Sequence, residues 1–181
     1  GIHVFTDIQY PFINIVSGAR MASADNFEVC VRGIASHGAY PHMGKDAILA
    51  SCAAITSLQS VVSRNIDPLD SVVISVGKIS GGDGVNIIAS DVMFEGTFRT
   101  FSTETQQIVY DRIRETIENT CRAYGCTAEI IFKKMANPVI NNKRITNIAS
   151  SSAKHLFGED ILIEKDKMAV AEDFSYYLDY V

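Results

Sequence analysis

The sequence predicts an α+β fold in which residues 24–134 form a ferredoxin-like β-α-β-β-α-β unit. Three observations support this prediction. Four segments have the two-residue periodicity or the β-branched content of strands, and two segments have the three- or four-residue periodicity of helices. Along the chain, these segments follow the order β-α-β-β-α-β. The chain has 181 residues, of which 47% are hydrophobic and 20% charged, so it can bury a core and is not a disordered chain.

The first strand and the first helix are expected between residues 26 and 62. Residues 26–35 alternate between apolar and polar side chains, which indicates a strand with one buried face. A polar loop follows, and the Asp46 side chain is placed to cap a helix. The apolar residues of this helix recur every three or four positions and are expected to face the core: Ile48, Cys52, Ile55, Leu58 and Val62.

The second half of the unit repeats this alternation. Residues 71–79 are rich in Val and Ile and predict a strand, and residues 85–100 predict a strand long enough to need a bulge or bend. A capping box at Thr103 opens a helix that Gly125 ends. Residues 127–133 predict the fourth strand.

The two flanks, residues 1–23 and 135–181, do not fit inside the four-stranded unit. Residues 143–157 predict a helix, and a strand is expected around Ile161. The simplest organisation is a central domain, residues 24–134, inserted between two flanks that belong together.

Composition argues against several classes of protein. The chain carries 16 Lys and Arg against 21 Asp and Glu, and this net charge of −5 argues against a nucleic-acid partner. The longest stretch without charged residues, 47–63, is short and interrupted by Ser and Thr, so no membrane span is expected. The cysteines lack metal-binding spacing and are expected to be buried free thiols, which favours the cytoplasm: Cys30, Cys52, Cys121 and Cys126.

Five residues are candidates for chemistry, each with a simpler alternative. His37, in the loop SHGAYPH, is either a polar loop residue or a hydrogen-bond donor to a developing oxyanion. His3 is either a core histidine or a metal ligand, and Glu172 alone would not complete a zinc site with it. Asn86 and Arg99 are either a turn amide and a strand-end charge, or contacts to a substrate whose carboxylate an Arg binds with two hydrogen bonds.

The order of the motifs is more informative than any one of them. From residue 1 to about residue 178, the chain contains in order GIHVF, MASADNFEVCVRG, SHGAYPH, VNII, EGTFRT and AEDFSYY, among others. This ordered set resembles the zinc-dependent amidohydrolases of the aminoacylase, hippurate hydrolase and auxin-conjugate hydrolase group, which are relatives of carboxypeptidase G. It implies a two-domain enzyme: a ferredoxin-like lid and dimerisation domain inserted in an α/β metallohydrolase catalytic domain, which is incomplete in this chain.

The resemblance also implies roles for the five residues. His3 matches a metal-ligand histidine. His37 matches the histidine that polarises the scissile carbonyl, often in the catalytic centre of the partner subunit. Asn86 and Arg99 match substrate contacts, with Arg99 near the substrate carboxylate, and Glu172 matches an acidic residue beside the pocket that would contact the substrate.

The implied reaction is hydrolysis of the amide bond of an N-acyl amino acid or small peptide by a homodimer with two divalent metal ions. Zinc is expected, with manganese, cobalt or nickel as alternatives. The family has Gly-Gly-His-Ala-Ala where this chain has Ala35-Ser36-His37-Gly38-Ala39. Its Cys/His metal motif, its Glu-Glu pair and its final His ligand are not in this sequence. The chain is therefore expected to be an internal segment that is inactive alone. The alternative is a non-catalytic dimerisation or small-molecule-binding module.

Overall fold

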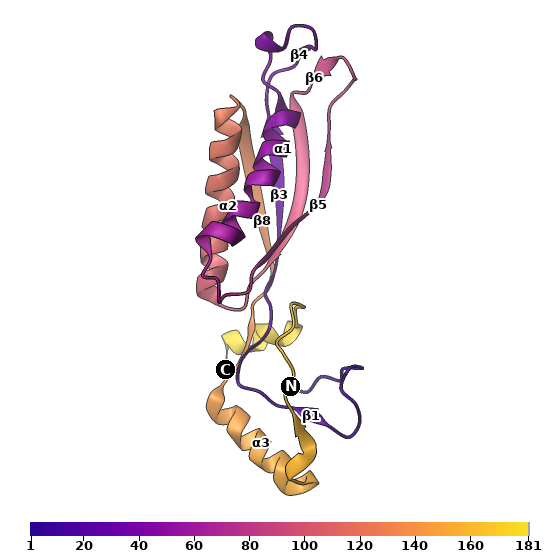
Figure 1. Ribbon diagram of the computed structural model, residues 1–181, viewed down its shortest axis with the longest axis vertical. Helices are drawn as coiled ribbons and strands as arrows, with labels where there is room; N and C mark the ends of the chain where they lie inside the picture. Colours follow the sequence, from indigo (N-terminus) through magenta and orange to yellow (C-terminus); the bar gives the residue numbers. More distant parts are fainter. Residues whose placement is uncertain (181) are drawn as a thin grey trace.

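A four-stranded antiparallel sheet dominates the computed structural model, which describes residues 1–180 (Figure 1). Its strands are β3 (Ala24–Arg32), β5 (Val73–Gly81), β7 (Asp91–Arg99) and β8 (Thr127–Ala136). They lie in the order β5-β7-β3-β8, and each neighbouring pair is antiparallel. The first of the four strands thus lies between the third and the fourth. This arrangement confirms the predicted α+β, ferredoxin-like fold.

Two helices lie side by side on one face of the sheet (Figure 1). They are α1 (Ala47–Ser57) and α2 (Thr103–Ala123). The start of α1 and the end of α2 are as predicted. The Asp46 side chain caps α1 and accepts a hydrogen bond from Leu49 N at 3.0 Å, and Gly125 follows α2 with a φ of +75°. The core between helices and sheet contains apolar residues of β3 and α2, among them Phe27, Val29, Val31, Val109, Ile113, Ile117 and Cys121.

The buried face of α1 differs from the prediction. Ile48 and Cys52 are exposed, whereas Leu58 is buried as predicted. The buried residues within the helix are small: Ala47, Ala50, Ser51 and Ala54. Because α1 packs against both α2 and the sheet, small side chains let its backbone approach closely. Ile48, Leu49 and Cys52 lie on the outer side, while Ile55 is partly buried against the core. A π-helical turn at Val61–Asn65 follows it.

Residues 85–100, predicted as one bent strand, form two strands, β6 (Ile87–Ile88) and β7. The break falls at Ala89 and Ser90. The carbonyl of Ala89 accepts a hydrogen bond from Ala47 N at 3.0 Å, and that of Ser90 accepts one from Gly33 N at 2.6 Å. The helix start and the end of β3 therefore hold the chain at this bend.

Beyond the bend, β6 pairs with β4 (Ser36–His37) in antiparallel fashion. A short 3-10 turn, η1 (Pro41–Met43), completes this projection. We call residues 34–45 and 82–88 the tip, because they extend the sheet at the end opposite to the chain termini (Figure 1).

The remaining residues, 1–21 and 139–180, gather at the other end of the molecule, which we call the base (Figure 1). Short strands join the two flanks: β1 (Ile13–Asn14) runs parallel to β10 (Leu162–Ile163), and β2 (Gly18–Met21) runs antiparallel to β9 (Val139–Asn141). The other elements are α3 (Lys143–Phe157), which has the predicted bounds, and two 3-10 helices, η3 (Glu159–Ile161) and η4 (Asp173–Asp179).

Buried polar contacts tie the sheet to its surroundings near the base. Ser23 N donates to Thr100 O at 2.7 Å, and the two hydroxyl groups lie 3.1 Å apart. The fully buried Asp25 carboxylate accepts hydrogen bonds from Gln106 Nε2, at 2.8 Å, and from the Tyr110 hydroxyl. Burial, together with this hydrogen bond, raises the pKa of Tyr110, so its hydroxyl remains a donor.

All four cysteines are free thiols, as predicted. Their burial was predicted correctly for Cys121 and Cys126 but not for Cys52, which is exposed on the outer side of α1, or for Cys30, which is partly exposed. Burial raises the pKa of Cys121 to about 11. Within residues 1–180, no helix has both the length and the apolar character that crossing a membrane requires.

Candidate functional site

His3 and Glu172 come from the two flanks and meet in the base. His3 Nδ1 lies 2.6 Å from Glu172 Oε2. The Glu172 side chain is 16% exposed, whereas that of His3 is 54% exposed. His3 also stacks on Phe5, with ring centroids 4.4 Å apart. Within residues 1–180, the His3 side chain is therefore only half-buried.

The segment after Glu172 packs on the start of the chain. Glu172 is the N-cap of η4, and its Oε1 accepts a hydrogen bond from Phe174 N at 3.4 Å. The Phe174 ring lies so close to Gly1 that a Cβ there would meet it at 2.9 Å. The GIHVF and AEDFSYY motifs, from opposite ends of the chain, thus form one cluster in the base.

His37 and Asn86 lie together in the tip. Gly38 N donates to Asn86 O at 2.7 Å, and both candidate side chains are exposed. His37 Nδ1 accepts a hydrogen bond from Ala39 N at 3.1 Å. A neutral imidazole that accepts at Nδ1 carries its proton on Nε2. His37 therefore presents an Nε2–H donor to solvent. The exposed Tyr40 ring, which sequence reasoning did not single out, lies beside that of His37, with ring centroids 5.9 Å apart.

Arg99 lies at the opposite end of the sheet from the tip. It ends β7, and its guanidinium donates to Thr97 Oγ1 at 2.5 Å and to Phe98 O at 3.0 Å. The next residue, Thr100, is the one hydrogen-bonded to Ser23 near the base. Arg99 is thus separated from the tip by the length of a nine-residue strand, on the order of 30 Å.

The five candidate residues therefore form two groups. His3, Glu172 and Arg99 lie at or near the base, whereas His37 and Asn86 lie in the tip. Among residues 1–180, no cluster of three or more His, Cys, Asp or Glu side chains could hold a metal ion. His3 and Glu172 alone do not make up a complete metal site. Within the described residues, one chain also does not bring all five candidate residues to one point.

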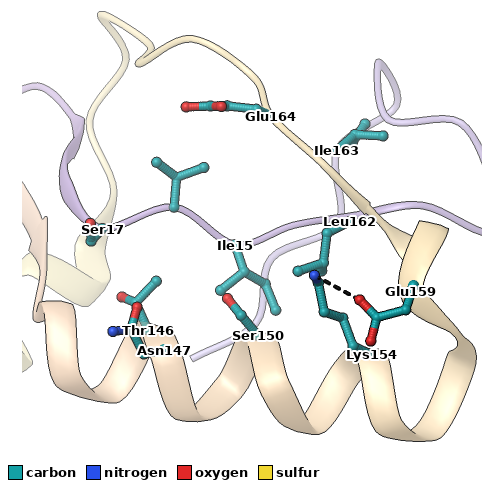
Figure 2. A pocket seen from close by; sticks show the side chains of 11 residues that line it. Ile15, Ser17, Thr146, Asn147, Ser150, Lys154, Glu159, Leu162, Ile163 and Glu164 are labelled. Carbon is teal, nitrogen blue, oxygen red and sulfur yellow. Dashed lines mark hydrogen bonds and ion pairs between the residues drawn. The ribbon is translucent and has the colours of Figure 1, made fainter.

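A hollow of about 430 Å³ lies elsewhere in the base, between α3 and the paired strands β1 and β10 (Figure 2). Ile15, Ser150 and Leu162 line it, and the Lys154–Glu159 ion pair, 2.9 Å long, crosses one end. It contains none of the five candidate residues. It is therefore separate from the candidate site.

A family model described as "Peptidase dimerisation domain" (M20) matches residues 22–125, which is more than half of the chain. The chain belongs to this M20 family. The matched residues include the strands β3, β5 and β7, the two covering helices and the tip, and they end at the turn after α2, before β8.

Relatives with assigned names are similar to this M20 chain along its whole length. An N-acetyldiaminopimelate deacetylase of Geobacillus sp. (strain WCH70) is 36% identical over 177 residues, which are 98% of this chain and 47% of the relative. An N-acetyl-L-cysteine deacetylase of Bacillus subtilis (strain 168) is 34% identical over 181 residues, 100% of this chain and 43% of the relative. The chain therefore spans about half the length of these relatives.

Solved structures agree with the fold. A putative aminohydrolase from methicillin-resistant Staphylococcus aureus superposes with a TM-score of 0.92 at 25% identity, covering 98% of this chain and 46% of that one. Bacillus subtilis YXEP, described as a dinuclear metal binding peptidase from the M20 family, superposes with a TM-score of 0.80 at 27% identity, covering 99% of this chain and 44% of that one.

Proposed function

We propose that this chain is part of a metal-dependent amidohydrolase that cleaves the amide bond of N-acyl amino acids or small peptides. Residues 24–134 would be its lid and dimerisation domain, and residues 1–23 and 135–181 would be parts of its catalytic domain. The observation that carries the proposal is the arrangement of the two groups. A histidine suited to a metal lies at one end of the sheet, and a histidine that presents an Nε2–H donor lies at the other.

Each group suits one part of amide hydrolysis. A bound divalent metal would polarise the carbonyl and make a water molecule acidic enough to attack it. His3 would bind such an ion through Nε2, because Nδ1 is directed at Glu172. The His37 Nε2–H would donate to the oxyanion that develops on the carbonyl oxygen. Arg99 would bind the substrate carboxylate, and the exposed Asn86 amide would contact the acyl-amino group.

The distance between the groups requires a second copy of the chain. The tip and base of one copy are separated by a strand length on the order of 30 Å, too far for one small substrate to contact both. We therefore propose that the tip of one subunit completes the centre of its partner in a homodimer. Each complete centre would hold two metal ions, with zinc as the first expectation and manganese, cobalt or nickel as alternatives. We also propose a cytoplasmic location, with which the free thiols are consistent.

The surface best suited to that dimer combines the outer side of α1 with the free edge of β5. β5 lies at the end of the strand order, so its outer backbone groups have no partner strand within residues 1–180. Ile79 pairs with the buried Phe94 and so lies on the helix side of the sheet, yet it is 49% exposed. Ile48 is 43% exposed and lies over Gly82, directly after β5.

The other sheet edge is less suitable for strand pairing. β8 carries two adjacent lysines, Lys133 and Lys134, and charged edge residues oppose pairing with another strand. The Tyr176 hydroxyl also donates to the Met135 carbonyl and so uses one of the backbone acceptors of β8.

A substitution on α1 tests this surface. We expect Ile48→Asp to weaken dimerisation by more than tenfold in Kd, because the interface would bury a carboxylate with no partner in each subunit. Sedimentation velocity over a concentration series measures this. The matched control is Ile108→Asp on α2, where the side chain is 45% exposed but distant from β5. A dimer that survives Ile48→Asp and dissociates with Ile108→Asp would place the interface on α2 instead.

The activity is tested on the full-length protein that contains this chain. We expect hydrolysis of N-acetyl amino acids, release of a free amine, loss of activity after dialysis against a chelator, and recovery when a divalent metal is restored. Activity that resists complete removal of metal, or absence of hydrolysis on all N-acyl amino acids and dipeptides tested, contradicts the proposal. Metal analysis of the active protein identifies the ion.

A further inference from the structure

We propose that Glu172 is a positioning residue that holds the His3 imidazole for metal binding, rather than a residue that binds the substrate. This inference deepens the proposed function and rests on it. The supporting contact is the 2.6 Å distance between Glu172 Oε2 and His3 Nδ1, which is the length of a charge-assisted hydrogen bond. Two ligand atoms of one tetrahedral metal ion lie about 3.3 Å apart, so the pair is too close to be two ligands of a single ion.

The Glu172 carboxylate is held from both sides. Its Oε1 accepts from Phe174 N at 3.4 Å as the cap of η4, while its Oε2 faces His3. The side chain is 16% exposed, so little of it faces solvent. Both oxygens therefore have a partner within the chain, and little of the carboxylate is left exposed for contact with a substrate. The carboxylate is instead suited to fixing the position of a neighbouring side chain.

The neighbour that Glu172 contacts is His3, whose half-exposed ring has few other contacts. The imidazole is 54% exposed, and apart from Glu172 it contacts Phe5 by stacking. A hydrogen bond from Nδ1–H to a carboxylate selects one tautomer, leaves the lone pair on Nε2 and makes that nitrogen a stronger ligand. Glu172 thus supplies orientation and basicity to the metal-binding atom, although it would not touch the metal.

The test uses the full-length protein and measures metal affinity by competition with a chromogenic chelator. Glu172→Ser keeps a side chain that can cap η4 but cannot reach His3. We expect it to weaken metal binding by roughly 10- to 100-fold at one of the two ions. Glu172→Gln keeps one acceptor oxygen, so we expect a smaller loss. The control is Asp173→Asn, which removes an exposed charge next to Glu172 without contacting His3, and its metal affinity should match the wild type.

Three results would overturn the inference. Wild-type affinity in Glu172→Ser would show that the contact does not position His3. Complete loss of one ion from Glu172→Ser at saturating metal would make Glu172 a ligand. An Asp173→Asn variant as weak as Glu172→Ser would reduce the effect to net charge. A wild-type protein that binds no divalent metal overturns the proposed function as well, so the two failures are distinguishable.

Discussion

His37→Ala in the full-length protein should lower kcat by roughly 10²- to 10³-fold with a small change in metal content, as expected for the loss of one oxyanion donor. The reason is the tautomer that the Ala39 amide selects, which leaves the Nε2–H of His37 exposed at the tip. Steady-state kinetics on an N-acyl amino acid measures the effect. His42→Ala is the matched control, because His42 is an exposed histidine of the same loop, and it should retain most of the activity.

Subunit mixing decides whether His37 acts in the partner. A His37→Ala subunit has an intact base, and a His3→Ala subunit has an intact tip. If the tip serves the partner, reassociated mixtures should regain about a quarter of the wild-type turnover, because half of the dimers are mixed and each has one intact site. If the tip served its own base, no mixed dimer would contain an intact site and turnover would stay at the level of the single variants.

Phe98→Ala should destabilise the chain by about 3–5 kcal/mol, the largest stability effect we expect from a single truncation. Phe98 is fully buried, and its ring lies edge-on to Tyr110 at 4.9 Å and to Phe132 at 6.5 Å. Truncation would lose these contacts and leave a cavity between α2 and the sheet. Urea unfolding of the 181-residue chain, followed by circular dichroism, measures the change.

Phe157→Ala provides the comparison for that measurement. Phe157 ends α3 and is 64% exposed, so its truncation should change the free energy of unfolding by about 0.5 kcal/mol or less. Equal effects of the two substitutions would mean that the ring of Phe98 is not packed as the structure has it.

The fold was predictable from the sequence because its determinants are local. Alternation in residues 26–35 and the valines and isoleucines of 71–79 identify strands, and Asp46 and Gly125 mark helix ends. Given the order of elements, few sheet topologies remain. The bend at Ala89 was less clear, because it depends on hydrogen bonds from residues that lie far away along the chain.

The buried face of α1 could not be derived from hydrophobicity alone. Ile48 and Cys52 belong to the predicted core stripe but are exposed, because the contacts with α2 and β7 select the alanines, whose size permits close approach. Hydrophobic periodicity finds an apolar stripe and does not tell whether it faces the chain's own core or another surface. The same ambiguity hides an interface from sequence-based reasoning.

The candidate residues could be named from their motifs but not placed. His3 and Glu172 lie in opposite flanks, and no periodicity relates them, so their contact follows only from the pairing of the flanks. Asn86 and Arg99 are close in sequence, yet an extended strand separates them by nearly its full length. A strand converts short sequence separations into long distances, so motif spacing alone does not tell which candidate residues lie together.

The junction between base and sheet has a mechanical consequence. The chain enters the sheet through β3 and leaves it through β8, and these two strands are direct neighbours. Both crossings therefore lie side by side, at one end of a lever arm on the order of 30 Å long whose other end carries His37. By simple geometry, a rotation of about 10° at the crossings would move the imidazole by roughly 5 Å over that strand length. Small torsions at two adjacent backbone positions would therefore be enough to move the tip by several ångströms relative to the base.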